Sequence, residues 1–314
     1  VYHDFSSGKR DPGAIRDFVK RVYDHSAQDA LIKYLLLFGD GSFNNRSDHE
    51  NNSNQIPTYQ SENSVHYTLS YVTDDFYGLL DDLEGGAAGL VDIGIGRIPI
   101  NTVEEATEMV DKIIAYNGEK AFGEWRNRIC FVADDEDNNI HMRDADILSN
   151  YVEAEYGAFN IHKIFLDSYV QESTPSGESY PEVNAAINED IRNGILIFNY
   201  TGHGNERGLA HENILGINDI QSWTNKDKLP LFVTATCEFS RFDDIDRDIY
   251  GDINRITSAG EMVLLSSEGG LVPVRIEMDD ATMTALVHRF DLINERGALA
   301  DNWRQVKLAA DDLK

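Results

Sequence analysis

The chain has 314 residues, enough to bury a sizeable core in one large unit or in two packed units. Hydrophobic residues make up 41% of the sequence and charged residues 26%, a balance typical of a globular rather than a disordered protein. The formal net charge of −28 argues against binding to nucleic acid or to an anionic membrane surface, because phosphate contacts need clustered Lys and Arg. We therefore expect no nucleic-acid partner, and no apolar run approaches the roughly 18 residues of a membrane span.

The two cysteines carry little information on the redox compartment. Cys130 lies in the apolar run 128–133, which is typical of a buried strand, so we interpret it as structural. Together with Cys237 it could form at most one disulfide, which is not a disulfide framework. Because the chain begins at Val1 without a signal-like apolar region, we expect a fragment or a mature piece of a longer protein.

Strand-like apolar runs alternate with helical periodicity over most of the chain, a pattern that predicts an α/β fold with a parallel sheet. The first expected elements are a helix opened by Asp11 and Pro12, a strand at 34–38, a polar surface loop at 42–64, a strand at 91–98 and a helix reaching about residue 116. The later ones are strands at 128–133 and 161–166, helices near 142–156 and 181–192, one strand before His203, one before Cys237, a strand at 262–267 and a helical tail at 279–314.

Two of these helix starts carry a capping-box pattern, Thr102 with Glu105 and Ser179 with Glu182. The segment 117–125 is polar and contains glycine, which favours a boundary between two α/β units. We therefore predict an N-terminal subdomain at 1–124 and a second subdomain at 125–314.

The strongest chemical signal is a pair of motifs, each of which closes an apolar run. Residues 195–204 read ILIFNYTGHG and place His203 between two glycines, and residues 231–238 read LFVTATCE and place Cys237 after the apolar part. In open α/β sheets, ligands gather outside the carboxyl ends of the strands. The spacing of 34 residues fits one crossover between neighbouring parallel strands. The motifs therefore predict the nucleophile and the acid/base of a cysteine hydrolase.

The same two residues, His203 and Cys237, also have a non-catalytic interpretation. A single Cys is usually a small buried residue, and a single His is more often a hydrogen-bonded structural residue than a catalyst. Gly202 and Gly204 favour catalysis, because they remove side chains around His203 and allow close approach of a substrate. A structural zinc site at Cys237 and His203 is not expected, since four ligands are needed and no Cys-x-x-Cys or His-x-x-x-His spacing is present.

The acidic run 134–137 follows the predicted strand 128–133 directly. A solvated turn is the default interpretation of such a run, but its place at a strand end leaves a role in the site, or in binding an ion, open. His211 and Glu212 follow His203 by eight and nine residues, and we expect them in a loop on the substrate side without a defined role.

The motif residues resemble those of the gingipain-type cysteine peptidases. The resemblance rests on residues 200–204 (YTGHG), 229–232 (LPLF) and 235–237 (ATC), and it extends upstream through 34–40 and 95–99, so that it covers most of the chain. Within the family, residues 5–8 and 37–43 are most similar to the sortase-like peptidases of type IX secretion.

This resemblance implies a caspase-like α/β fold of two subdomains, with mostly parallel sheets flanked by helices and the active site in the second subdomain. It implies that His203 is the general acid/base and Cys237 the nucleophile of a thioacyl-enzyme. The backbone N–H groups of Gly204 and Cys237 would form the oxyanion hole, since charge on a tetrahedral oxygen needs preorganised donors.

In the family a third, acidic residue orients the histidine. Counting from Cys130 in the matching strand, this residue falls on Asp135, with Asp134 and Glu136 as neighbouring alternatives. The acidic run 134–137 thereby gains a function in the catalytic site.

The resemblance also sets expectations about the substrate. We expect substrate binding by residues at the two strand ends and beyond them, namely Thr201, Gly202, Ala235, Ser267 and Glu268. Selectivity for Arg is not expected, because the pocket acid of Arg-specific members falls ambiguously near 142–144 and no Trp stands at 270–272.

A polypeptide substrate, secretion-complex partners and an extracytoplasmic place at the bacterial cell surface or outer membrane follow from the same resemblance. No cofactor is expected to be required, and a structural Ca²⁺ ion is compatible with the acidic runs. The alternative is a non-catalytic cell-surface binding module that keeps the peptidase fold as a scaffold, because fold alone does not decide function.

Overall fold

The computed structural model describes residues 1–27, 31–45, 54–61, 71–85, 89–174, 177–237, 239 and 242–243. The predicted strand at 262–267 and the predicted tail helix at 279–314 lie outside the described residues. The same holds for two predicted substrate-binding residues, Ser267 and Glu268.

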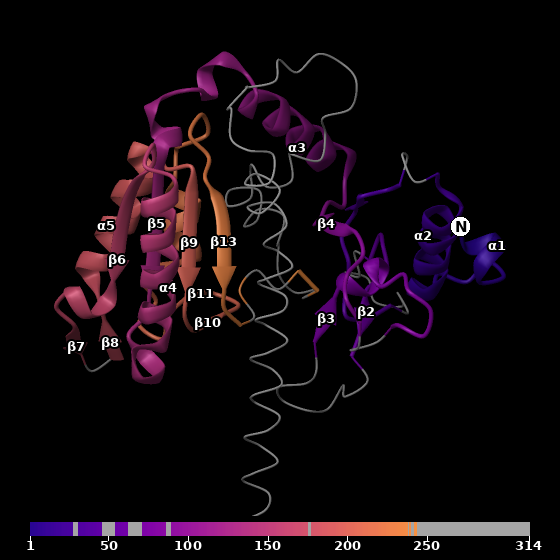
Figure 1. Cartoon of the computed structure of the whole chain (residues 1–314), viewed down its shortest axis with the longest axis horizontal. Coiled ribbons are helices and arrows are strands. Elements are labelled where there is room, and N and C mark those ends of the chain that lie inside the picture. Colours follow the sequence, from indigo (N-terminus) through magenta and orange to yellow (C-terminus); the bar gives the residue numbers. More distant parts are fainter. Residues whose placement is uncertain are drawn as a thin grey trace, which may run out of the picture. The chain divides into compact units, whose positions relative to one another are not determined.

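The chain has a mixed α/β fold (Figure 1). Residues up to 127 form the helices α1 (Tyr2–Phe5), α2 (Pro12–His25) and α3 (Val103–Tyr116), the short 3-10 helices η1 (Asp75–Gly78), η2 (Glu119–Ala121) and η3 (Glu124–Asn127), and the strands β1 (Tyr34–Phe38), β2 (Tyr59–Gln60), β3 (Val72–Thr73) and β4 (Gly94–Ile98).

The described residues from 128 onward form three further α-helices, one 3-10 helix and most of the strands. The helices are α4 (Glu136–Glu155), α5 (Pro181–Asn193), α6 (Ile217–Ser222) and the 3-10 helix η4 (Leu166–Ser168). The strands are β5 (Arg128–Ala133), β6 (Asn160–Phe165), β7 (Glu172–Thr174), β8 (Gly177–Ser179), β9 (Ile197–Thr201), β10 (Gly204–Asn205), β11 (Gly208–Leu209), β12 (Leu215–Gly216) and β13 (Leu231–Ala235).

Four parallel strands form the main sheet, in the order β13-β9-β5-β6 (Figure 1). The register aligns Thr201, the last residue of β9, with Ala133 of β5 and Ala235 of β13. The segments that follow these three strands therefore leave the sheet at the same edge. This pairing confirms that the strands before His203 and Cys237 are neighbours, as their spacing predicts.

The central strand β5 is buried on both faces, as expected of an apolar run in a parallel sheet. Ile129 and Phe131 point to one face and pack in a cluster with Val152 of α4. Cys130 and Val132 point to the other face, into the cluster that includes the apolar side of α5. The two helices thus cover opposite faces of the sheet, because side chains alternate along a strand.

The strands β1 and β4 pair in parallel over their full lengths. Helix α2 begins after Asp11, whose carboxylate accepts a hydrogen bond from the N–H of Gly13 at 2.7 Å, as the Asp-Pro start predicts. Helix α3 begins with both halves of the predicted capping box between Thr102 and Glu105.

The second predicted capping box is wrong. Helix α5 begins after Tyr180, and no side chain caps it. Ser179 instead ends β8, where it pairs with Glu172 of β7 in an antiparallel hairpin. The strand pairing, which the sequence pattern did not reveal, removes Ser179 from the capping position.

The expectation of a polar surface loop over 42–64 is wrong in part, because Phe43 and Gln55 are exposed but other residues described there are buried. Ser42 and Thr58 are fully buried, and the Thr58 hydroxyl donates to the carbonyl of Ser42 at 2.8 Å. Asn54 is buried as well. Polar side chains can be buried at low cost when they hydrogen-bond the backbone of a loop, so composition alone was misleading.

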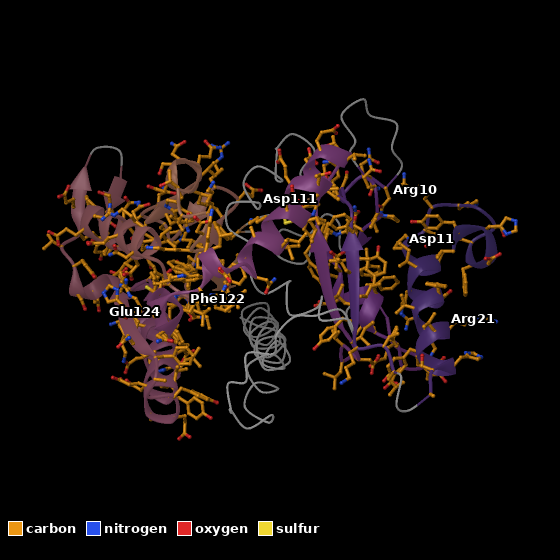
Figure 2. All side chains as sticks on the ribbon, turned by 90° about the horizontal axis from the view of Figure 1, so that it is seen from above. Arg10, Asp11, Arg21, Asp111, Phe122 and Glu124 are labelled. Carbon is orange, nitrogen blue, oxygen red and sulfur yellow. The ribbon has the colours of Figure 1, made fainter. Side chains whose placement is uncertain are left out.

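The connection between α3 and β5 packs around Arg126. Its guanidinium donates to the carbonyls of Tyr116 at 2.8 Å and Ala121 at 2.9 Å, and it lies 4.2 Å from the ring centroid of Phe122. Phe122 and Glu124 are labelled on this connection in Figure 2. The boundary predicted between 124 and 125 falls within it.

Among the described helices, none has the length and apolar composition that crossing a bilayer requires.

Candidate active site

The glycines around His203 are required by close packing at the end of β9. A Cβ atom added at Gly202 would lie 2.6 Å from the carboxyl carbon of Asp134 and 2.5 Å from the hydroxyl of Tyr200. A Cβ atom at Gly204 would overlap the hydroxyl oxygen of Thr236. Gly204 therefore lets the segment after β9 lie directly against the segment after β13, which carries Cys237.

Asp134 is the buried centre of this packing. It is fully buried, yet its Oδ2 accepts the backbone N–H of His203 at 2.5 Å and the hydroxyl of Tyr200 at 3.4 Å. Its Oδ1 contacts Nδ1 of His141 at 2.5 Å. Burial would raise the pKa of Asp134, but the hydrogen bonds from His141 and from the His203 backbone outweigh burial and lower it. Asp134 is therefore a carboxylate, and the interpretation of a solvated turn is wrong for this residue.

His141 and Asp134 form a charge-assisted pair. The hydrogen bond to Asp134 raises the pKa of His141, while burial opposes this effect. Because Nδ1 of His141 faces Asp134, its Nε2 is directed to the other side, where Asp137 Oδ2 lies at 3.8 Å. The rings of His141 and His203 meet edge to face, with their centroids 5.1 Å apart.

Asp137 is the carboxylate beside the ring of His203. Its Oδ2 lies 3.2 Å from Nε2 of His203. Three successive residues, Asp137, Asn138 and Asn139, have left-handed backbone angles with φ between 53° and 61°. Asp and Asn tolerate this region best among residues with side chains. The left-handed turn interrupts the start of α4 and brings Asp137 to the ring of His203.

His211 covers the other side of His203. The two imidazoles stack at a centroid distance of 4.8 Å and an interplanar angle of 11°. His211 in turn lies 3.6 Å from a carboxylate oxygen of Glu136. The neighbouring Glu212 is buried, and burial raises the pKa of its carboxyl group. The loop expected on the substrate side thus contacts the predicted acid/base directly.

Cys237 is a free and exposed thiol two residues after the end of β13. Just before it, the N–H of Gly202 donates to the carbonyl of Ala235 at 3.2 Å, which extends the pairing of the two strands beyond their ends. A Cβ atom at Gly204 would lie 3.4 Å from the carbonyl oxygen of Cys237. The structure therefore places the two predicted motifs against each other.

The other predicted site residues are placed as follows. Thr201 and Ala235 are paired in register at the strand ends, next to Gly202.

Asp135 accepts the hydroxyl of Tyr180 at 2.7 Å, and its second carboxylate oxygen is buried without a partner among the described residues. Among the described residues, no hydrogen bond or ion pair joins Asp135 to the ring of His203. Ser267 and Glu268 lie outside them.

Sequence reasoning missed His141 and did not single out Asp137 within the acidic run. Both follow the strand β5 within a few residues, and the spacing of four residues between them was the available signal. That spacing places two side chains on one face of a regular helix. The left-handed turn at 137–139 could not be read from the sequence.

Two groups of side chains in the described part of the chain have metal-ligating atoms within 4.8 Å of one another. One comprises Asp137, His141 and His203, and the other comprises Cys130, His162 and Asp190. The first group belongs to the site described above. The second lies within the sheet and beneath α5.

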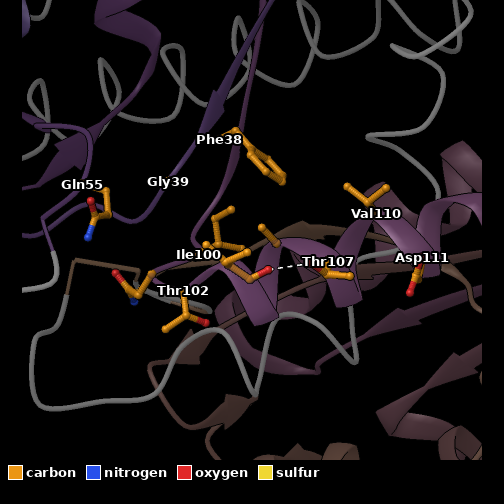
Figure 3. A pocket seen from close by; sticks show the side chains of 11 residues that line it. Phe38, Gly39, Gln55, Ile100, Thr102, Thr107, Val110 and Asp111 are labelled. Atoms are coloured by element: carbon orange, nitrogen blue, oxygen red, sulfur yellow. Dashed lines mark hydrogen bonds between the residues drawn. The ribbon is translucent and has the colours of Figure 1, made fainter.

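A separate cavity of about 490 Å³ lies between the end of β1 and helix α3. Figure 3 shows Phe38, Ile100 and Val110 among the side chains that line it. Its lining includes neither His203 nor Cys237. The cavity therefore does not include the predicted nucleophile or the predicted acid/base.

Comparisons with known proteins concern the family and the fold of the chain. A family model for peptidase family C25 matches residues 1–282. Among solved structures, the chain is similar to the Arg-specific cysteine proteinase gingipain R (RgpB), with a TM-score of 0.53 and 22% identity over 74% of this chain and 47% of that chain. It is also similar to the complex of the RgpB pro- and mature domains of Porphyromonas gingivalis, with a TM-score of 0.54 and 21% identity over 76% of this chain and 48% of that chain.

A further match is to dimeric latent PorU from Porphyromonas gingivalis, with 31% identity over 40% of this chain and 13% of that chain and a TM-score of 0.32. No curated protein sequence matches the chain significantly. The chain spans about half the length of the gingipain chains that it matches. The likeness to these chains shows a caspase-like α/β fold, and the family-model match shows that the chain belongs to peptidase family C25, the gingipain family of cysteine peptidases.

Proposed function

We propose that this chain cleaves peptide bonds through a covalent thioester on Cys237. The observation that carries the proposal is the packing of Gly204 against Thr236 and Cys237, which brings the two motifs together at one edge of the sheet. In the proposed reaction, His203 takes the thiol proton as the sulfur attacks the substrate carbonyl carbon. The same imidazole then gives this proton to the leaving amine, and water resolves the thioester.

Negative charge develops on the carbonyl oxygen during both steps. We assign its stabilisation to the backbone N–H groups of Gly204 and Cys237, which lie on the two packed segments. Such donors are effective because they are already oriented before the charge develops. Gly204 supports this role, since a side chain at that position would overlap Thr236 and separate the segments.

The carboxylate that orients His203 comes, in our proposal, from the acidic run after β5. Asp135 is the candidate that the family resemblance gives, and its carboxylate accepts a hydrogen bond from Tyr180. Asp137 is the candidate that the geometry favours, since its Oδ2 lies 3.2 Å from Nε2 of His203. A third group of this kind normally holds the catalytic imidazole in place.

The direct experiment is cleavage of a peptide library by the purified chain and by its Cys237→Ala and His203→Ala variants. We expect both substitutions to abolish cleavage, while Cys130→Ser leaves it intact in a folded protein. Undiminished cleavage by Cys237→Ala would contradict the proposal. Absence of cleavage in the unsubstituted chain, with the thiol of Cys237 reactive and the fold intact, would favour the binding module instead.

The substrate in this proposal is a polypeptide that lies over the strand ends, in contact with Thr201, Gly202 and Ala235 and with the predicted residues Ser267 and Glu268. A sortase-like outcome, in which an amine rather than water resolves the thioester, is the finer form of the proposal. It rests on the similarity of residues 5–8 and 37–43 to sortase-like members of the family. A cleavage assay with an added amine, such as a glycyl peptide, distinguishes transfer from hydrolysis when the masses of the products are measured by mass spectrometry.

The same similarity supports the remaining proposals on context. We place the protein outside the cytoplasm, at the cell surface or outer membrane of a bacterium, with secretion-complex proteins as partners. The proposed chemistry uses side chains and backbone groups alone and requires no cofactor. A structural Ca²⁺ ion remains an expectation, which a rise of the melting temperature on adding Ca²⁺ to chelator-treated protein would test.

A further inference from the structure

A second cluster of reactive side chains lies in the main sheet, away from the strand ends that carry His203 and Cys237. Cys130 of β5 and His162 of β6 are direct partners in the parallel register, so their side chains point to the same face. Asp190 of α5 covers them on that face, and its Oδ2 lies 2.5 Å from Nδ1 of His162. The thiol, the imidazole and the carboxylate have ligating atoms within 4.8 Å of one another.

The surroundings of this trio are apolar. Cys130 is fully buried in the same cluster as Val132, Ile164 and the inner side of α5. The buried carboxylate of Asp190 in such surroundings costs free energy unless it is paired. Arg128 supplies one partner, because its Nη2 lies 2.9 Å from Asp190 Oδ1. That pair leaves the second carboxylate oxygen, Oδ2, facing the imidazole of His162.

The three side chains supply the donor set that zinc-class cations prefer. Zn²⁺ binds Cys sulfur at about 2.3 Å, and His nitrogen and carboxylate oxygen at about 2.0–2.2 Å. In the present arrangement, each ligand comes from a different element, β5, β6 and α5. The hydrogen bond from Arg128 to Asp190 has the form of an outer contact that orients a ligating carboxylate.

Without a metal the trio holds protons that a cation would have to displace. Burial and the neighbouring Asp190 raise the pKa of the Cys130 thiol well above its ordinary value, so the sulfur is protonated. The hydrogen bond to Asp190 raises the pKa of His162. Binding of a cation would form bonds to Sγ, Nδ1 and Oδ2, and the protons from sulfur and from Nδ1 would leave to solvent.

The trio is open to solvent on one side. The side chain of His162 has 47% of its surface exposed, whereas Asp190 has 4% and Cys130 none. In the proposed site, the cation is reached from the side of the imidazole. A water molecule on that side would be the fourth ligand and would complete a tetrahedral set.

We propose that Cys130, His162 and Asp190 form a binding site for a zinc-class divalent cation that ties β5, β6 and α5 together. The site is independent of peptide cleavage, because none of its residues takes part in the chemistry assigned to His203 and Cys237. A bound cation stabilises the folded state by mass action, since the unfolded chain does not hold the three ligands together.

The test uses the full chain with Cys237→Ala, which leaves Cys130 as its only thiol. Titration with Co²⁺ should produce a near-ultraviolet thiolate-to-cobalt charge-transfer band that saturates at one equivalent and is removed by Zn²⁺. The other ligand group, Asp137, His141 and His203, contains no sulfur and cannot give this band. The band therefore reports the proposed site alone.

His162→Ala and Asp190→Asn, each made in the Cys237→Ala chain, should weaken Co²⁺ binding by roughly tenfold or more. His25→Ala is the matched control, because His25 lies on α2 and should leave the titration unchanged. Far-ultraviolet circular dichroism verifies the fold of each variant. His162→Ala is the substitution least able to disturb the fold, because His162 is exposed. No saturable band, or a band that His162→Ala leaves unchanged, would overturn the proposal and show the trio to be an ion-pair network alone.

Discussion

Asp134 is bonded to the backbone of His203 rather than to its ring. The N–H of His203 donates to Asp134 Oδ2 at 2.5 Å, while the ring nitrogen Nε2 lies 3.2 Å from Asp137. The acidic run after β5 therefore has two separate roles. Asp134 holds the backbone of His203 in place, and Asp137 contacts the imidazole. This division explains why several acids follow one another at a single strand end.

We expect Asp134→Asn to lower both stability and turnover. An amide cannot replace the ionic hydrogen bonds to His141 and to the His203 backbone, and loss of such a buried interaction costs about 1–3 kcal/mol. Displacement of the His203 segment should lower kcat by roughly 10- to 100-fold. Thermal unfolding and peptide-cleavage kinetics measure the two effects, and a variant with unchanged stability and kcat would exclude Asp134 as the residue that positions this segment.

Gly204→Ala should separate the two motif segments. The new methyl group would overlap the hydroxyl of Thr236, which costs about 1–3 kcal/mol when packed neighbours must shift. Cleavage should fall by roughly 100-fold, because the segment with Cys237 moves relative to His203. Cleavage rates and melting temperatures of the two proteins provide the measurement.

The double variant Gly204→Ala/Thr236→Ala removes the atom that the new methyl group meets, so it should recover part of the lost activity. Gly157→Ala is a matched control, since nothing lies within 4 Å of a Cβ atom at that glycine. If Gly204→Ala behaves like Gly157→Ala, close packing of the segments is not what the site needs.

The Asp134–His141 pair should make stability depend on pH in a defined window. The raised pKa of His141 means that its contribution is complete below the ordinary value of about 6.5 and is lost as pH rises through the raised value. The lowered pKa of Asp134 means that its contribution is complete above about 3.8 and is lost as pH falls through the lowered value. The pair is therefore most stabilising between about pH 4 and 6.5.

Chemical unfolding of the parent chain and of His141→Gln over a series of pH values tests this window. Asp134, Asp137 and Asp144 all raise the pKa of His141, with Asp134 as the largest cause and Asp144 as a small one. Asp144→Asn is therefore the control, because it removes a negative charge without breaking the hydrogen bond between Asp134 and His141. The difference in unfolding free energy between parent and His141→Gln should be largest near pH 5 to 6 and should shrink above neutral pH. A difference that stays constant up to pH 9 would contradict the pairing.

Asp135→Asn and Asp137→Asn identify the carboxylate that orients His203. Substitution of the orienting acid should lower turnover by roughly one to four orders of magnitude and leave the fold intact. Tyr180→Phe is the control for Asp135, because it removes the hydroxyl that Asp135 accepts. A large loss in Asp137→Asn with little loss in Asp135→Asn assigns the role to Asp137, and the reverse result assigns it to Asp135.

Much of the fold could be predicted from apolar patterning. The strand at 128–133 has the predicted bounds, and β9 and β13 are neighbours, as the spacing of their motifs indicates. These predictions succeed because a strand buried on both faces has to be apolar along its length, and parallel neighbours need a crossover of minimum length.

The details of the site could not be predicted, because they depend on contacts between distant segments. Asp134 reads as a solvated acid in the sequence, but His141 and the backbone of His203 make it a buried carboxylate. Asp137 reaches His203 only because the backbone turns left-handed at 137–139. Ser179 and Thr58 show the same limit, since strand pairing and tertiary hydrogen bonds decide their environments.

The most direct test of the account is to map the residue that a peptide electrophile, such as a peptidyl chloromethyl ketone, labels in the parent chain and in His203→Ala. We expect one covalent label, located by peptide mass mapping on the exposed thiol of Cys237, with the buried Cys130 unmodified. Labelling should slow strongly in His203→Ala, because the imidazole no longer takes the thiol proton. Labelling of Cys130 at the same rate, or labelling of Cys237 that does not depend on His203, would contradict the account.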